Sequence, residues 1–208
     1  MQNVSVFFRF GFLLRFLALA LNLVSGFALG AETTVPAFYG QEVTGAGFGR
    51  EFRLKDASGK WRTQEDYRGK LVLMFFGFTQ CADVCPTELQ RIARLMTALG
   101  KKAAHVQVLF VTLDPARDSA TMIQSYVSAF NQRFIGLRAD EAATAAVAKE
   151  FKVFFRKVPG SAPDRYSLDH STYIYVLDAE TRLRLRFTSD IEIDSMKADV
   201  LRLLAQVH

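Results

Sequence analysis

The apolar residues of this chain occur in continuous blocks and in helically spaced stripes, and the two patterns alternate. Three blocks, over 70–78, 106–114 and 134–140, have the length of strands that are buried on both faces. Stripes between and after them predict helices from Pro86 to Gly100, over 119–130 and over 141–153. Later blocks over 171–178 and 182–187 are expected to pair as a hairpin before a closing helix.

Strands that alternate with helices imply right-handed crossovers, and therefore a mainly parallel sheet. The last hairpin adds antiparallel strands. The predicted fold class is α/β, specifically a thioredoxin-like fold with a central, mainly parallel sheet flanked by helices. In residues 51–63, the apolar Phe52 and Leu54 alternate with polar residues, and a turn is expected at Ser58-Gly59. This predicts a hairpin that covers a sheet edge. Residues 157–169 are expected to form a loop.

The first thirty residues have the pattern of an export leader. They contain Arg9 and Arg15, no acidic residue, and a dense apolar stretch over 16–29 that ends in small residues near Gly30. A retained membrane anchor is the alternative, because about 20 apolar residues are reached by counting back past Arg15. Either way the rest of the chain crosses the membrane, which predicts the periplasm or an equivalent exported compartment, with the protein soluble or anchored to the inner membrane.

The remainder is long enough for one domain, with a lead-in over 31–46 and a thioredoxin-like domain over 47–208. The net charge of +5 includes Arg9 and Arg15, and the other basic residues are scattered rather than clustered. No nucleic-acid partner is expected from such a distribution. The sequence "GAGFG" over 45–49 is predicted to be a loop, because it lacks the spacing and the preceding strand of a dinucleotide site.

Candidate chemistry is concentrated at the only two cysteines, Cys81 and Cys85, which follow the first apolar block and precede a helix. The exposed N–H groups and the dipole at a helix N-terminus favour the thiolate, which is both a nucleophile and a metal ligand. The C-x-x-x-C spacing leaves room for a third group at the sulfurs. In an oxidising compartment, a local disulfide is the simpler alternative.

The third group is expected to be His170, one of three histidines. It opens the block 171–178, which should neighbour the strand that leads into the cysteine loop. Two thiolates and an imidazole select Cu(I) and hold Cu(II) with a further ligand, whereas structural zinc would want a fourth protein ligand. Asp83 and Asp169 are candidates to orient these ligands from outside, and Asp83 equally to bind loop amides.

Other possible ligands are expected to have no part in the site. His105 begins a predicted strand at the end of the sheet opposite the cysteines, and His208 is the last residue. Four methionines fall at core positions of predicted strands or helices and are interpreted as packing residues: Met74, Met96, Met122 and Met196.

Three segments together resemble the SCO/SenC family of copper-binding, thioredoxin-like assembly proteins for cytochrome oxidase: "FFGFTQCADVCPTEL", "VTLDPARDSATMIQSYVSAFNQRFIGL" and "YSLDHSTYIYVLDAE". The resemblance runs from about residue 49 to the C-terminus. It implies that Cys81, Cys85 and His170 are copper ligands, and that the partner is the oxidase subunit with the binuclear copper site. Gln80 and Ala82 depart from the histidine and proline common in the family, which bears on copper affinity and partner choice.

Four functions follow from these features. The preferred one is a copper chaperone rather than an enzyme. The second is a thiol–disulfide oxidoreductase in which Cys81 and Cys85 are the catalytic pair, kept reduced by a thiol reductant of the compartment. A peroxidase and a binding module with an inert disulfide are weaker alternatives, because neither requires the histidine.

Overall fold

The computed structural model describes residues 38–162 and 165–206. The leader over 1–30, residues 31–37 of the lead-in, residues 163–164 of the predicted loop, Val207 and His208 lie outside these residues. In the part of the chain that is described, no helix combines the length and apolarity needed to cross a membrane.

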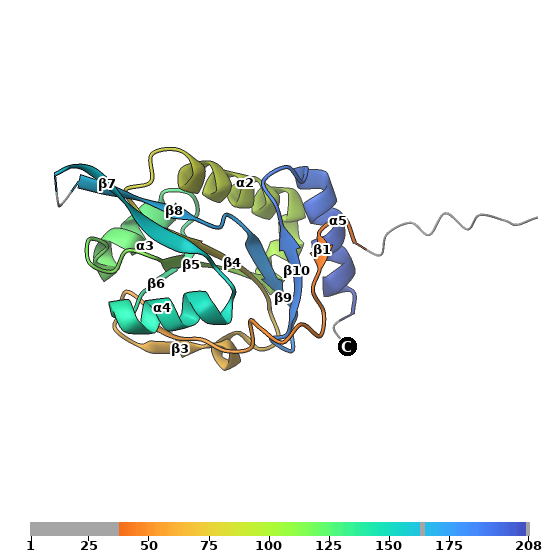
Figure 1. Cartoon of the computed structure of the whole chain (residues 1–208). Helices are drawn as coiled ribbons and strands as arrows, with labels where there is room; N and C mark the ends of the chain where they lie inside the picture. Colours follow the sequence, from red (N-terminus) through yellow and green to blue (C-terminus); the bar gives the residue numbers. More distant parts are fainter. Residues whose placement is uncertain (1–37, 163–164, 207–208) are drawn as a thin grey trace, which may run out of the picture. The chain divides into compact units, whose positions relative to one another are not determined.

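A six-stranded sheet forms the centre of the domain (Figure 1). Its strands, in spatial order, are β1 (Gln41–Glu42), β10 (Leu183–Phe187), β9 (Ile174–Leu177), β4 (Leu71–Gly77), β5 (Val106–Thr112) and β6 (Ile135–Leu137). The β4–β5 and β5–β6 pairs are parallel, and the pairs on the other side of β4 are antiparallel. The thioredoxin-like α/β prediction is confirmed. The sheet is mixed rather than mainly parallel, because β9 runs antiparallel to both β4 and β10 and β1 adds a third antiparallel pair.

Strand β1 lies in the segment that was expected to be an irregular lead-in. Gln41 and Glu42 pair with Arg186 and Leu185 of β10. Two paired residues are too short to give a recognisable alternation of apolar and polar positions. The folded domain therefore starts before residue 47.

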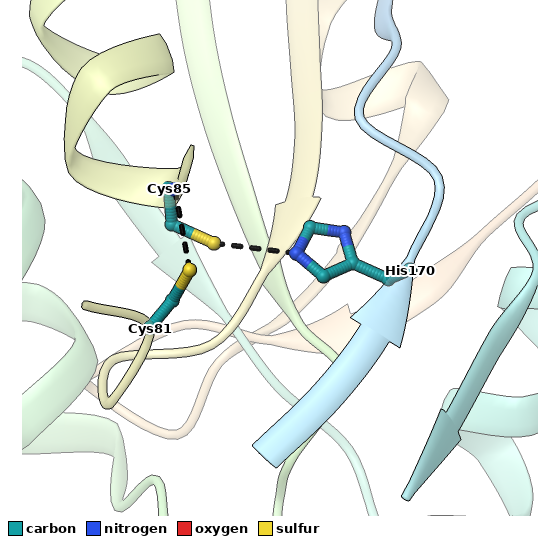
Figure 2. A group of neighbouring side chains, drawn as sticks. All are labelled: Cys81, Cys85 and His170. Carbon is teal, nitrogen blue, oxygen red and sulfur yellow. Dashed lines mark hydrogen bonds between the residues drawn. The ribbon is translucent and has the colours of Figure 1, made fainter. Parts of the chain in front are cut away.

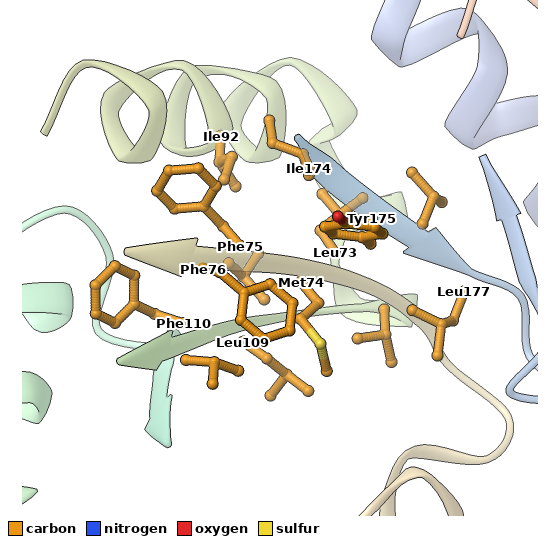
Figure 3. Packing of buried hydrophobic residues seen from close by; sticks show 14 of the residues in the cluster. Leu73, Met74, Phe75, Phe76, Ile92, Leu109, Phe110, Ile174, Tyr175 and Leu177 are labelled. Carbon is orange, nitrogen blue, oxygen red and sulfur yellow. The ribbon is translucent and has the colours of Figure 1, made fainter. Parts of the chain in front are cut away.

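Strand β4 is the centre of the core, as its apolar sequence predicts. All seven of its residues are buried, and Phe75 pairs with Phe110 of β5 on one side and with Ile174 of β9 on the other. Figure 3 shows Phe75 and Ile174 packed with Ile92 between the sheet and a helix. Full burial of one such side chain contributes about 1.5–3 kcal/mol to the free energy of unfolding. Because successive residues of β4 point to opposite faces and all are buried, contacts on both faces fix its position.

Four helices flank the sheet: α2 (Val84–Leu99), α3 (Ala120–Ser128), α4 (Glu141–Glu150) and α5 (Ile193–Leu204). The apolar stripe of α2 is buried, and the helix stops at Gly100, which has a positive φ of 54°. Arg91 of α2 binds Glu88 and donates to the carbonyl of Ile191, which joins α2 to the start of α5. In Figure 1, α2 lies above the sheet, α4 lies below it, and α5 lies at the right, next to β1 and β10.

Two small hairpins and two short 3-10 helices, η1 (Gln64–Tyr67) and η2 (Gly100–His105), complete the described elements. The predicted first hairpin is confirmed as β2 (Arg53–Lys55) and β3 (Trp61–Thr63). Lys55 exchanges backbone hydrogen bonds of 2.7 and 2.9 Å with Arg138, directly after β6. This hairpin therefore covers the sheet edge, as expected.

The second hairpin replaces a predicted loop. It consists of β7 (Phe155–Ala162) and β8 (Arg165–His170), which pair only with each other. Pro159 and Gly160 stand within β7, and both residue types weaken the sequence signal of a strand. The loop prediction for 157–169 was wrong for this reason.

One of the four methionines also departs from prediction. Met74, Met96 and Met196 are buried, but Met122 on α3 is 47% exposed. The buried residues of α3 are Ile123 and Val127, so Met122 lies on its outward face.

Candidate metal centre

The cysteines lie at the carboxyl end of β4, where open α/β sheets form their sites. Cys81 belongs to the loop after β4, and Cys85 is the second residue of α2. Gly77 ends β4 directly below them: a Cβ atom there would lie 2.8 Å from Cys85 Sγ and 2.9 Å from Phe110 Cε2. A glycine at this position therefore leaves the space that the Cys85 sulfur occupies.

The structure brings Cys81, Cys85 and His170 together, as the sequence analysis expected. Their ligand atoms all lie within 4.8 Å of one another. The Cys85 backbone N–H donates to Cys81 Sγ at 3.3 Å, and His170 Nε2 lies 3.4 Å from Cys85 Sγ. Figure 2 shows the imidazole facing the two sulfurs. Both cysteines are free thiols, Cys85 fully buried and Cys81 half-buried.

His170 reaches the site from an element that the sequence analysis did not expect. It is the last residue of β8, and β9 begins only at Ile174. The strand after His170 was expected to lie beside the strand that leads into the cysteine loop. This is confirmed, because β9 pairs with β4. The imidazole thus approaches from the hairpin rather than from the main sheet.

The orientation of the His170 ring is fixed by its neighbours. Nδ1 lies 2.8 Å from the carbonyl oxygen of Ser171. A carbonyl only accepts, so this hydrogen bond assigns the proton to Nδ1 and leaves the Nε2 lone pair directed at the sulfurs. The rings of Phe75 and Phe78 meet the imidazole at centroid distances of 6.3 and 5.9 Å.

The two cysteines differ in acidity. A hydrogen bond from the Cys85 thiol, together with the backbone N–H groups of Cys85 and Asp83, lowers the pKa of Cys81 to about 5. The same hydrogen bond to Cys81, together with burial, raises the pKa of Cys85 above its usual range. The site therefore holds one thiolate at neutral pH, and its partner keeps its proton.

The two aspartates do not orient the ligands through their carboxylates. The Asp83 side chain is exposed and makes no capping hydrogen bond, so only its backbone contributes, to Cys81. Asp169 accepts hydrogen bonds from Arg156 at 2.8 and 3.0 Å. Adjacent residues of a strand point to opposite faces, so Asp169 points away from the site that His170 enters, and the Ser171 carbonyl takes the expected role.

Asp118 is a residue of the site that sequence reasoning missed. Its fully buried carboxylate accepts from the Thr79 hydroxyl at 2.5 Å, the Thr79 N–H at 3.1 Å and the Thr112 hydroxyl at 2.5 Å. It thereby joins the ends of β4 and β5 and holds the start of the cysteine loop. The available signal was the second aspartate of "LDPARD", which follows closely after a strand that is buried on both faces.

Comparison with known proteins assigns this chain to one family. The profile of the SCO1/SenC family matches residues 40–205, and the chain belongs to this family.

Individual relatives agree with the assignment. An SCO2-like protein of Rickettsia felis is 36% identical over 143 residues, which cover 68% of this chain and 70% of the relative. The structure of Bradyrhizobium japonicum ScoI with copper bound has a TM-score of 0.70 and 36% identity, covering 76% of this chain and 99% of that one. Apo Sco1 from Thermus thermophilus has a TM-score of 0.73 and 35% identity, with 82% and 99% covered.

Proposed function

We propose that this protein is a copper chaperone that binds Cu(I) and Cu(II) through Cys81, Cys85 and His170 and delivers copper to the binuclear copper site of cytochrome c oxidase. The observation that carries the proposal is the cluster of two sulfurs and one imidazole nitrogen within 4.8 Å. The copper bound by the related Bradyrhizobium japonicum protein supports it.

The donor set suits copper better than zinc. Among the residues that the structure describes, the cluster consists of two cysteines and one histidine, without a carboxylate. Structural zinc takes four protein ligands. Soft thiolates favour Cu(I), and the imidazole adds a ligand that Cu(II) takes readily.

The burial of the two sulfurs suggests an order for copper release. Cys81 and His170 are partly exposed, whereas Cys85 is fully buried. A thiolate of the receiving subunit can approach the exposed side first. Copper then exchanges Cys81 and His170 for ligands of the partner before it leaves Cys85.

The proposed setting is the periplasm or an equivalent exported compartment, with the protein soluble or anchored to the inner membrane through residues 1–30. The receiving oxidase subunit faces the same compartment. Because that compartment is oxidising, a thiol reductant must keep Cys81 and Cys85 reduced before copper binds.

A thiol–disulfide oxidoreductase is the second candidate, and the different acidities of the cysteines favour it. The Cys81 thiolate would attack a disulfide of the partner and form a mixed disulfide, releasing one partner thiolate. Cys85 would then attack Cys81, releasing the second partner thiol and leaving a Cys81–Cys85 disulfide. Two electrons pass to the partner, and the hydrogen bond that raises the pKa of Cys85 no longer exists in the mixed disulfide.

Copper stoichiometry tests the first candidate. The reduced protein should bind one Cu(I), and the oxidised disulfide form none, because both thiolates are needed. Cys81→Ser and Cys85→Ser should each lose tight binding. Stoichiometric copper on the fully oxidised protein would contradict the ligand assignment.

His170 is tested by comparing the two oxidation states. His170→Ala should keep most of its Cu(I), because two thiolates suffice. It should lose Cu(II) affinity by at least about tenfold, which is roughly 1.4 kcal/mol, with a weakened sulfur-to-Cu(II) charge-transfer band. His105→Ala is the matched control, since this exposed imidazole precedes β5 at the opposite end of the sheet. If both states bind to His170→Ala as before, the site is a bare dithiol and the oxidoreductase becomes the better candidate.

A further inference from the structure

The hairpin that carries His170 is separate from the sheet that carries the cysteines. Strands β7 and β8 form a two-stranded sheet of their own, without a ladder to the main sheet. Apart from the three residues that link β8 to β9, the position of His170 over the sulfurs therefore depends on contacts between the hairpin and the body of the domain.

The inward face of β8 is defined by alternation along the strand. Tyr166, Leu168 and His170 are partly or fully buried, whereas the residues between them are exposed. Leu168 packs into the core, but apolar packing is non-directional. A directional contact on the same face is provided by Tyr166, which is about 13 Å from His170 along the strand at 3.3 Å per residue.

Tyr166 is held by a buried ion pair in the segment after β5. Its hydroxyl donates to Asp114 Oδ1 at 2.7 Å, and Arg117 Nη1 donates to its backbone carbonyl at 2.8 Å. The Arg117 guanidinium also lies 3.6 Å from the centroid of the Tyr166 ring. Arg117 Nε in turn donates to Asp114 Oδ2 at 2.5 Å, and the Asp114 side chain is only 1% exposed.

The same segment is attached to the cysteine half of the site. Asp118, the residue after Arg117, binds Thr79 at the start of the cysteine loop. One stretch of five residues thus contacts the loop with Cys81 through Asp118 and the hairpin with His170 through Asp114 and Arg117.

We propose that Asp114, Arg117 and Tyr166 form a latch that positions His170 over Cys81 and Cys85. Its relevance to copper rests on the proposed function, in which His170 is a ligand. Tyr166 and Arg117 are positioning residues, because they act through the imidazole and do not contact the sulfurs.

The first test uses the copper-free protein. In the parent, NMR should detect contacts between the ring protons of His170 and Phe78, whose centroids are 5.9 Å apart. Tyr166→Leu removes the hydroxyl and the ring but leaves the Asp114–Arg117 pair intact, and it should weaken these contacts. Arg156→Gln is the matched control, because it breaks an exposed ion pair confined to the same hairpin. In Arg156→Gln the contacts between His170 and Phe78 should remain as strong as in the parent.

The second test measures Cu(II) binding in a double-mutant cycle. Tyr166→Leu should lower Cu(II) affinity by about tenfold, in the direction of His170→Ala, while Cu(I) affinity stays near that of the parent. In the His170→Ala background the Tyr166 change should have no further effect, because both changes remove the same ligand. A tenfold loss in that background as well would overturn the positioning role.

Two further measurements keep the outcomes separable. Arg117→Lys retains a cation beside Asp114 but loses the planar fork that reaches Tyr166, so it gives the same test if Tyr166→Leu does not fold. If His170→Ala binds Cu(II) like the parent, the ligand role in the proposed function fails. The NMR contacts between His170 and Phe78 in the copper-free protein then still test the latch. If these contacts persist in both Tyr166→Leu and Arg117→Lys, the latch is overturned.

Discussion

At the level of single residues, the site combines one reactive sulfur with one shielded sulfur. Cys81 is half-buried and has a lowered pKa, whereas Cys85 is fully buried and has a raised pKa. Four positions separate them, and the turn into α2 brings the Cys85 N–H onto Cys81 Sγ. The helix N-terminus therefore favours negative charge on Cys81 through individual hydrogen bonds rather than through the dipole alone.

The first prediction concerns alkylation of the metal-free, reduced protein by iodoacetamide. Because only the thiolate reacts, a pKa of about 5 means that Cys81 remains mostly thiolate from pH 9 down to pH 6. The rate at Cys81 should therefore stay nearly constant over that range and fall by half near pH 5. Mass spectrometry should find a single alkylated site.

Cys81→Ser provides the control for this measurement, since it leaves only the fully buried Cys85. That variant should react slowly at every pH in the range. A pH profile for the parent that is centred near the ordinary thiol pKa of about 8.5 would contradict the assigned hydrogen bonds.

The second prediction concerns Gly77, the residue below Cys85. In Gly77→Ala the new methyl group would lie 2.8 Å from Cys85 Sγ and 2.9 Å from a Phe110 ring carbon. Overpacking of this kind typically costs about 1–3 kcal/mol of unfolding free energy. The change should also displace the Cys85 sulfur and weaken Cu(I) binding, as measured by competition with a chelator.

Gly47→Ala is the matched substitution. Its Cβ would meet only the end of the flexible Arg50 side chain, at 3.4 Å. We expect a change in unfolding free energy within about 0.5 kcal/mol. Equal stability of both variants would mean that the space above Gly77 is not needed.

At the level of secondary-structure elements, the sequence predicted those whose signal is local and strong. The block that became β4 is apolar throughout, because both faces of a central strand are buried. The stripe of α2 and its stop at Gly100 were equally plain. The β7–β8 hairpin was missed because Pro159 and Gly160 stand within β7 and weaken the signal of a strand.

The same distinction applies to the site. Cys81, Cys85 and His170 were found from their residue types, their spacing and a family resemblance, and the structure brings them together. Asp118 was missed because its partner Thr79 is 39 positions away, and only the parallel pairing of β4 with β5 brings the two residues together. Asp169 was misassigned because adjacency in sequence places two strand residues on opposite faces.

A third prediction tests the link between elements that Asp118 provides. Asp118→Asn keeps the shape of the side chain but replaces one acceptor oxygen by an NH2 group. A mismatched buried hydrogen bond costs about 1–3 kcal/mol, and the Thr79 amide should exchange with solvent faster. Asp140→Asn, at the exposed N-cap of α4, is the control: asparagine caps as well as aspartate, so its unfolding free energy should be nearly unchanged. Unchanged exchange at Thr79 in Asp118→Asn would argue against the link.

At the level of the whole domain, the edge of the sheet far from the cysteines is closed by a contact between the two ends of the described chain. The fully buried carboxylate of Asp199 on α5 accepts from Tyr39 N–H at 2.9 and 3.1 Å and from Gly40 N–H at 2.7 Å. Val43 N–H then donates to the Arg184 carbonyl at 2.8 Å. These contacts hold β1 against β10. Strands β1 and β10 lie on one side of β9, and β4 lies on the other.

The fourth prediction follows from that arrangement. Asp199→Ala removes the acceptor of two backbone N–H groups, and hydrogen bonds to a charged group contribute about 1.5–3 kcal/mol. We expect the unfolding free energy to fall by about this amount and the Val43 amide to exchange faster, while Cys81 alkylation and Cu(I) stoichiometry stay at the parent level. Asp194→Ala, an exposed carboxylate in the first turn of the same helix, should cost no more than about 1 kcal/mol. Because β10 and β9 separate β1 from the strand that carries the cysteine loop, a matching loss of copper binding in Asp199→Ala would show that the far edge of the sheet is coupled to the site.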